Sequence, residues 1–126
     1  MTRSEITVNE LAGAWATRET PDAIDKSNHH SIAAGSDFER MMILVHISAG
    51  TGTGGDVTIK SGTEAPAFRR ALGDLAIGAD LVADDEYVIG PIETARFLQS
   101  DGTIHIDITD TSNTNIAGTI EAYALP

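Results

Sequence analysis

Hydrophobic and polar residues alternate along much of the chain after residue 28. Residues 103–109 show this most clearly, with three isoleucines on one side and only polar side chains on the other. A period of two is typical of a β-strand with one buried and one solvated face. Residues 116–125 continue the pattern, and we expect them to form a hairpin with residues 103–109 through the turn at 110–115. One side of the last strand is formed by Ile116, Gly118, Ile120, Ala122 and Ala124.

Further strands are predicted at intervals of about ten residues. Residues 38–48 are almost all apolar, which is expected for a central strand covered on both faces. About eight short strands with frequent turns favour an all-β, single-domain, antiparallel β-sandwich with a jelly-roll-like strand order. Three more strands are predicted at residues 29–33, 57–60 and 96–99. Residues 75–82 and 87–89 are predicted to form a hairpin. Its acidic tip is Asp84, Asp85 and Glu86, and Gly90 and Pro91 end its second strand.

Two segments depart from the strand pattern. Residues 66–72 start with a proline and are followed by Gly73, which predicts one short helix. Residues 1–27 are polar and rich in turn residues, and we expect an N-terminal arm, or a first strand, followed by a loop. The sandwich domain is then expected to span residues 28–126.

The N-terminal region has two interpretations. It is either a mobile terminus or an arm that docks on a neighbouring subunit. Residues 6–8 are predicted as a short strand, and Asn9 as the cap of a helical turn that follows it. The docking interpretation assigns subunit or capsid contacts to Ile6, Val8, Leu11 and Trp15.

Charge narrows the range of partners. The 126 residues hold 8 basic and 19 acidic side chains, which gives a net charge of −11. An acidic surface repels nucleic-acid phosphates and anionic lipids, so neither nucleic acid nor membrane is an expected partner. It suits a partner with a basic surface, or a salty medium.

The chain has no cysteine, which excludes disulfides and thiolate chemistry. Its longest apolar run, residues 41–47, is far too short to span a bilayer. The sequence also shows no secretory signal pattern, and we expect the protein to be synthesised in a host cytoplasm.

A glycine-rich loop at residues 50–55 matches the pattern G-x-G-x-x-G. In a dinucleotide-binding fold those glycines open a helix whose N-terminus holds the pyrophosphate. Here the β-branched, alternating residues 57–60 follow, so we expect a hairpin connection and no cofactor.

Metal binding is not expected either. His29, His30, His46 and His105 show no metal-ligand spacing, and we expect each to be a surface or half-buried side chain. Residues 107–115 offer oxygen ligands for calcium, but they lack the glycine and distal glutamate of an EF-hand and suit a polar turn.

Catalysis has no recognisable sequence signal. Serines and aspartates are abundant, but none lies in a motif such as G-x-S-x-G. We therefore expect a protein that is not an enzyme and has no catalytic residue.

Several segments resemble a recurring pattern in small virion proteins of tailed bacteriophages. The segments are residues 57–62, 66–69, 72–75, 87–102 and 118–126, within a match over about residues 28–126. The proteins concerned are jelly-roll head decoration proteins, also called cement or minor capsid proteins. The resemblance implies a structural virion protein on the outer capsid surface. It would bind the major capsid protein, form a trimer and stabilise the shell by bridging capsid subunits.

Two alternatives stay open. One is a carbohydrate-binding module, in which Trp15, Tyr87 or Tyr123 would stack on a glycan. The other is a different virion component, from the tail or connector.

The last strand, residues 116–125, matters for all of these functions. Its only charged residue is Glu121, so we expect the strand to lie inside a sheet or to pair across a subunit boundary.

Overall fold

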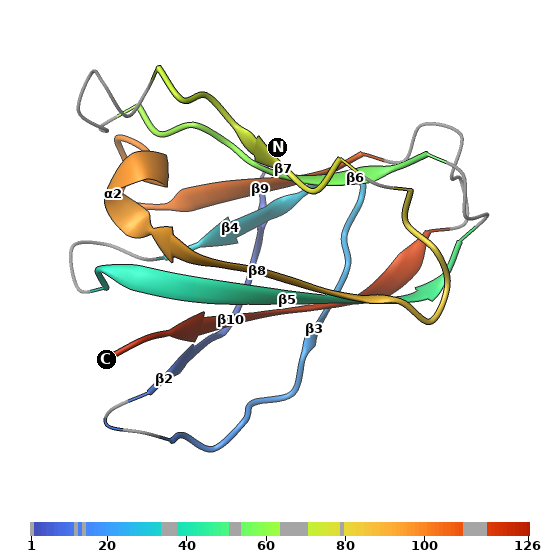
Figure 1. Ribbon diagram of the computed structural model, residues 1–126, viewed down its shortest axis with the longest axis horizontal. Helices are drawn as coiled ribbons and strands as arrows, with labels where there is room; N and C mark the ends of the chain where they lie inside the picture. Colours follow the sequence, from blue (N-terminus) through green and yellow to red (C-terminus); the bar gives the residue numbers. More distant parts are fainter. Residues whose placement is uncertain are drawn as a thin grey trace.

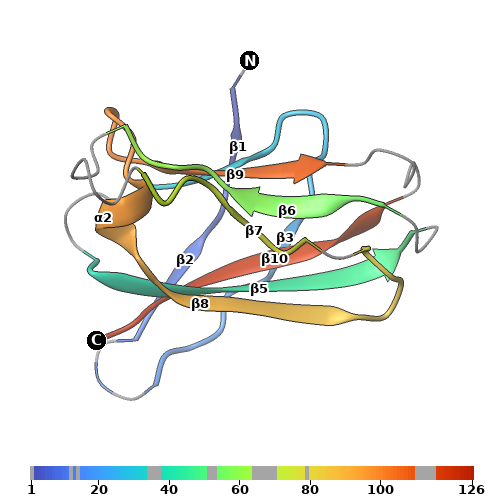
Figure 2. The same ribbon diagram turned by 45° about the horizontal axis from the view of Figure 1, so that its top comes forward.

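The computed structural model describes residues 2–11, 13, 15–33, 38–50, 54–63, 71–78, 80–109 and 116–126. These residues form two mixed β-sheets, which Figures 1 and 2 show packed face to face. Among the described residues a short helix, α2 (Thr94–Phe97), lies at one end of the sandwich (Figure 1). The predicted all-β sandwich is confirmed.

We name the two sheets A and B. Sheet A has the order β1 (Ser4–Glu5), β4 (His30–Ile32), β9 (Ile104–Thr109), β6 (Asp56–Ile59) and β7 (Leu75–Ala76). Sheet B has the order β2 (Val8–Glu10), β10 (Ala117–Ala124), β5 (Arg40–Ala49) and β8 (Glu86–Glu93), and β3 (Asp22–Ala23) also pairs with β10.

The core lies between the sheets and consists mainly of branched aliphatic side chains. Alternation along each strand sends every second side chain inward, where β-branched residues pack well on the pleated surface. The inward side predicted for the last strand is confirmed, because Ile120 and Ala122 are fully buried. The central strands β9 and β5 supply Ile104, Ile106, Ile108, Ile43, Val45 and Ile47, each at most 1% exposed.

The N-terminal residues are part of the sandwich rather than an arm beside it. β1 pairs in parallel with β4 in sheet A, and β2 pairs in parallel with β10 in sheet B. Between them Ile6 is buried in the core at 1% exposure, and the chain passes from one sheet to the other (Figure 2). The predicted strand at residues 6–8 is therefore wrong in its bounds. These parallel pairs also make the sheets mixed, where purely antiparallel sheets were expected.

Asn9 does not cap a helical turn. It lies in β2, where its side-chain oxygen accepts a hydrogen bond from the Glu19 amide at 2.8 Å. Its side-chain nitrogen donates to the Ala122 carbonyl at 3.3 Å. Pairing with β10 satisfies the backbone of this segment and overrides the local capping preference.

Neither predicted hairpin forms, because successive strands cross between the sheets. β9 pairs with β4 and β6, whereas β10 pairs with β2, β3 and β5. β7 pairs with β6 and β8 pairs with β5, so the described residues of 75–78 and 80–82 do not pair with residues 87–89. The strands themselves are largely where the alternation places them. β10 lies between β2 and β5, which confirms that the last strand is inside a sheet.

β8 continues through Gly90 and Pro91, where the sequence predicts its end. The register with β5 shifts between Met41 and Ile43, which indicates a β-bulge opposite Gly90. Gly90 has φ 122°, and an added Cβ would lie 2.8 Å from the Met41 carbonyl oxygen, so only glycine fits there. The strand predicted at residues 96–99 is wrong, since α2 occupies residues 94–97 and buries Phe97.

Three predicted features fall on undescribed residues. Most of the helix expected at 66–72 lies outside the described part, and residues 71 and 72 form a turn. Parts of the glycine-rich loop and of the loop at 107–115 are also outside it. β6 follows the glycine-rich loop, which confirms a strand in place of a helix.

Candidate functional site

The outer faces of the two sheets differ in chemistry. On sheet A the outward positions of β4 and β9 are polar, with Ser31, His105 and Asp107. On sheet B the outward positions include Leu44 and Val88, and Val88 is 62% exposed. β5 is therefore covered on one face only, and the prediction of burial on both faces is wrong. We use the term sheet B face for the outward residues Met42, Leu44, His46, Glu86, Val88, Thr119, Glu121 and Tyr123.

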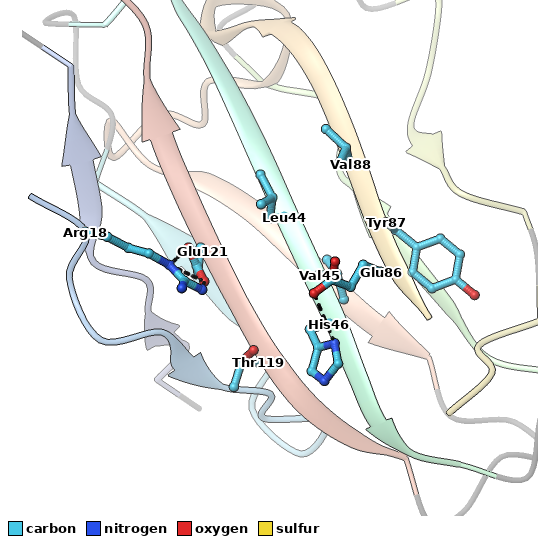
Figure 3. A pocket seen from close by; sticks show the side chains of 9 residues that line it. All are labelled: Arg18, Leu44, Val45, His46, Glu86, Tyr87, Val88, Thr119 and Glu121. Atoms are coloured by element: carbon cyan, nitrogen blue, oxygen red, sulfur yellow. Dashed lines mark hydrogen bonds and ion pairs between the residues drawn. The ribbon is translucent and has the colours of Figure 1, made fainter. Parts of the chain in front are cut away.

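A shallow hollow of about 180 Å³ lies on the sheet B face (Figure 3). Cross-strand pairing builds it, because His46 on β5 lies opposite Thr119 on β10 and Glu86 on β8. In the next row Leu44 lies opposite Glu121 and Val88. The hollow thus combines apolar walls with polar side chains from three neighbouring strands.

A buried carboxylate closes one side of the hollow. Glu121 is 5% exposed, and the Arg18 guanidinium holds both of its oxygens, with Nε at 3.1 and 3.0 Å and Nη2 on Oε1. The Tyr123 hydroxyl donates to the second oxygen. The Arg18 hydrogen bonds, with a smaller contribution from Tyr123, hold the pKa of Glu121 below its ordinary value. Burial, together with the neighbouring carboxylate, raises the pKa of Tyr123.

This ion pair also fixes the segment between β2 and β3. Arg18 belongs to that segment, and its guanidinium lies over β10 in Figure 3. The hydrogen bond from the Glu19 amide to Asn9 adds a second attachment. Residues 16–21 of this segment lie at the bottom of Figure 1, away from the body of the sandwich.

His46 and Glu86 form a weaker polar pair in the hollow. Their closest atoms, Nδ1 and Oε1, are 3.5 Å apart, and Nδ1 has no hydrogen-bond partner. In the described part of the chain no cluster of three or more His, Asp or Glu side chains could hold a metal ion.

The structure separates the four residues predicted to contact another subunit. Ile6 is a core residue of its own chain, and Val8 is partly buried against that core, so Ile6 is corrected to an internal role. The Leu11 amide donates to the Ala124 carbonyl at 3.0 Å, which extends the β2–β10 pairing. Trp15 is 78% exposed. Contact with another subunit stays a prediction for Leu11 and Trp15.

The histidines do not come together at one site. His46 lies on the sheet B face, whereas His29, His30 and His105 lie in or beside sheet A. The expected surface or half-buried position is wrong for His30, which is 0% exposed. His29 accepts a hydrogen bond from the Ile108 amide at 3.0 Å.

The tyrosines named for glycan stacking are held by the protein itself. The Tyr87 hydroxyl donates to the Asp80 carbonyl at 3.0 Å, and its ring points away from the hollow in Figure 3. Tyr123 is bound to Glu121. Among the described aromatic residues Trp15 has the ring that is most open to solvent.

Comparison of the chain with protein-family models, with curated proteins and with solved structures finds no significant match. No helix in the described ranges is long and apolar enough to cross a membrane.

Sequence reasoning missed the sheet B face. Met42 and Leu44 lie within an unbroken apolar run, so the alternation of β5 was hidden by apolar residues on both of its sides. Arg18 gave no signal, because its partner Glu121 is 103 residues away along the chain. The isolated Glu121 in an otherwise uncharged strand was the one visible hint of a paired carboxylate.

Proposed function

We propose that this protein is a structural virion component, a decoration or cement protein that binds the outer surface of a phage head. It acts as a trimer and bridges subunits of the major capsid protein. The proposal rests on the resemblance of residues 28–126 to such proteins and on the surface chemistry of the sandwich.

The observation that supports it best is the sheet B face with its exposed Val88. This partly apolar face, in a chain of net charge −11, offers exposed apolar surface that a partner can bury. Glu121 is already neutralised there by Arg18. The exposed Trp15 adds an aromatic anchor, a residue type enriched in binding hot spots.

A shell-stabilising mechanism follows from linkage. A protein that binds the assembled shell and not its free subunits shifts the equilibrium toward the shell. Many copies acting together allow each contact to be modest. The acidic surface suits the outside of the particle, away from packaged DNA.

The first test is the composition of the particle. We expect this protein in purified virions at near-stoichiometric ratio to the major capsid protein, and on the head in particle images. Absence from virions rejects the proposal, and a position on the tail or connector replaces it with the other virion role.

The second test asks whether the sheet B face docks. Val88→Glu places a charge on that face, and Thr109→Glu makes a matched change at an exposed position of β9 in the other sheet. We expect Val88→Glu to abolish binding to capsids that lack the protein, and Thr109→Glu to leave it unchanged. Equal binding by both variants contradicts docking through this face.

A glycan array tests the carbohydrate-binding alternative. Retention of the wild-type protein on the array that is lost in Trp15→Ala favours that alternative.

A further inference from the structure

The N-terminal strand is attached to sheet A by a small set of contacts. The Ser4 amide donates to the His29 carbonyl at 3.0 Å, and the Ile6 amide donates to the Ser31 carbonyl at 2.8 Å. β1 contains two residues, so this backbone pairing is short. The remaining attachment comes from side chains. Ile6, which follows the strand, is buried in the core, and several polar contacts of the strand meet at His30.

The His30 ring joins two separate segments. Its Nδ1 lies 3.2 Å from the Ser4 carbonyl oxygen, and its Nε2 lies 2.9 Å from the Asp25 amide nitrogen. A carbonyl only accepts and an amide N–H only donates, so Nδ1 carries the proton and Nε2 is the acceptor. His30 is 0% exposed, and this arrangement requires the neutral ring.

Asp25 reinforces the same junction. One carboxylate oxygen accepts from the Ser4 hydroxyl at 2.5 Å, and the other accepts from the Ser27 and Asn28 amides at 3.1 and 2.9 Å. The Ser4 hydrogen bond, followed by those from Asn28, holds the pKa of Asp25 below its ordinary range. Asp25 therefore stays ionised while histidines titrate.

Protonation of His30 would break this junction. With both ring nitrogens protonated, Nε2–H would face the Asp25 N–H, and two donors cannot form a hydrogen bond. Burial lowers the pKa of His30, and the Ser4 carbonyl and the carboxylates of Asp25 and Asp22 only partly oppose it. The folded state therefore disfavours the charged ring.

We propose that His30 is an acid-sensitive latch for the N-terminal strand, and that its protonation releases β1 from sheet A while the rest of the sandwich stays folded. The latch is local because β2 is independently held by β10 in sheet B. This inference does not depend on the proposed virion role.

Other ionisable groups surround the latch and are controlled for in the test. Arg3 of the N-terminal strand donates to the Asp107 carboxylate at 2.6 Å and to the His30 carbonyl at 3.1 Å. Burial, with a further effect of Arg3, lowers the pKa of His105 on β9. Like His30, His105 is therefore harder to protonate in the folded protein than in an unfolded chain. The ionisable groups near His30 on the neighbouring elements are Arg3, Asp22, Asp25, His29, His105 and Asp107.

The expected pH dependence has a definite sign. The pKa of His30 is lowered from 6.5 on folding, so the released strand binds the proton more readily than the latched one. The latch is closed above the ordinary histidine pKa and opens as the pH falls toward the lowered value. Within that window the opening equilibrium rises about tenfold for each pH unit.

Nuclear magnetic resonance tests this on the wild-type protein. The ring nitrogen signals of His30 give its tautomer and its pKa, and hydrogen exchange gives the protection of the Ser4 and Ile6 amides. Ile47 and Leu125 report on sheet B, since their amides donate to the Asp85 and Arg40 carbonyls. We expect a proton on Nδ1 and a loss of protection at Ser4 and Ile6 that follows His30 titration, with Ile47 and Leu125 unchanged.

Two variants assign the effect to one histidine. His30→Gln keeps an oxygen that can accept from the Asp25 amide and removes the titration, so the protection of Ser4 and Ile6 should no longer depend on pH. His105→Gln should retain the wild-type dependence. The proposal is overturned if the Ser4 and Ile6 amides stay protected through the titration of His30. It is also overturned if the amides of Ser4, Ile6, Ile47 and Leu125 lose protection together. A pH dependence that survives in His30→Gln, or that disappears in His105→Gln, overturns it as well.

Discussion

Gly118 shows how closely the backbones of β10 and β5 approach each other. A Cβ added to this glycine would lie 1.9 Å from the His46 carbonyl oxygen, where the register of the two strands shifts. The obstacle is backbone in a central strand pair, which cannot move aside as a flexible side chain can. Glycine is therefore required at this position for packing, whatever its conformational freedom.

Gly118→Ala should destabilise the protein by about 3 kcal/mol or more, because the two central strands of sheet B must separate. The matched control is Gly102→Ala, since Gly102 has φ 83° and nothing within 4 Å of an added Cβ. That change should cost only about 1 kcal/mol of backbone strain. Urea unfolding measures both, and equal losses would contradict the clash.

Arg18→Met should raise the pKa of Glu121, since it removes the main group that lowers it. The wild-type carboxylate has its pKa lowered from 4.5, so its contribution to stability is present above that value and is lost as the pH falls through the lowered one. The difference in unfolding free energy between wild type and variant should therefore be largest above about pH 5 and shrink in acid.

Carboxyl titration by nuclear magnetic resonance and urea unfolding across the pH range measure these two effects. Arg40→Met, a change of the same kind on β5, should leave the Glu121 titration as it is. A stability difference that grows on acidification would show that Arg18 acts through another partner.

At the scale of elements, the N-terminal strands hold both sheets at once. β1 and β2 belong to different sheets, and Ile6 between them fills the core. The N-terminal segment has the polar sequence expected of a mobile terminus, yet it stabilises the fold through these contacts.

Ile6→Ala and Trp15→Ala separate the internal and external roles of this segment. Ile6→Ala should lower the free energy of unfolding by about 3 kcal/mol, because it leaves a cavity between the sheets. Trp15→Ala should change it by no more than about 0.5 kcal/mol, since the ring is 78% exposed. Urea unfolding of both variants checks this, and a large loss for Trp15→Ala would mean that its ring packs on the sandwich.

At the scale of the whole molecule, the net charge of −11 dominates long-range interactions. The acidic chain suits a basic capsid surface, and across such a contact binding should weaken as salt rises from about 0.1 M to about 1 M, since the screening length falls from about 10 Å to about 3 Å. Binding measured by capsid sedimentation at several salt concentrations tests this. Binding that strengthens with salt would mean that apolar contacts at the sheet B face outweigh charge.

The sequence predicted the strands better than it predicted their partners. The alternation of residues 103–109 and 116–125 located β9 and β10 and their buried sides. It could not show that the two strands lie in different sheets, because every residue carries the same backbone donor and acceptor whichever strand lies opposite. The candidate site was missed for a related reason, since Arg18 and Glu121 meet only through the fold.

The sequence by itself determined the all-β class, the buried side of the last strand and the acidic surface. Each is a local or additive property, set by side-chain period or by a sum of charges. Only the tertiary structure decided that the first strands cross the sandwich, that α2 replaces a strand and that His30 is buried. These depend on contacts between distant segments, in which burial and backbone pairing outweigh the local preferences that a sequence displays.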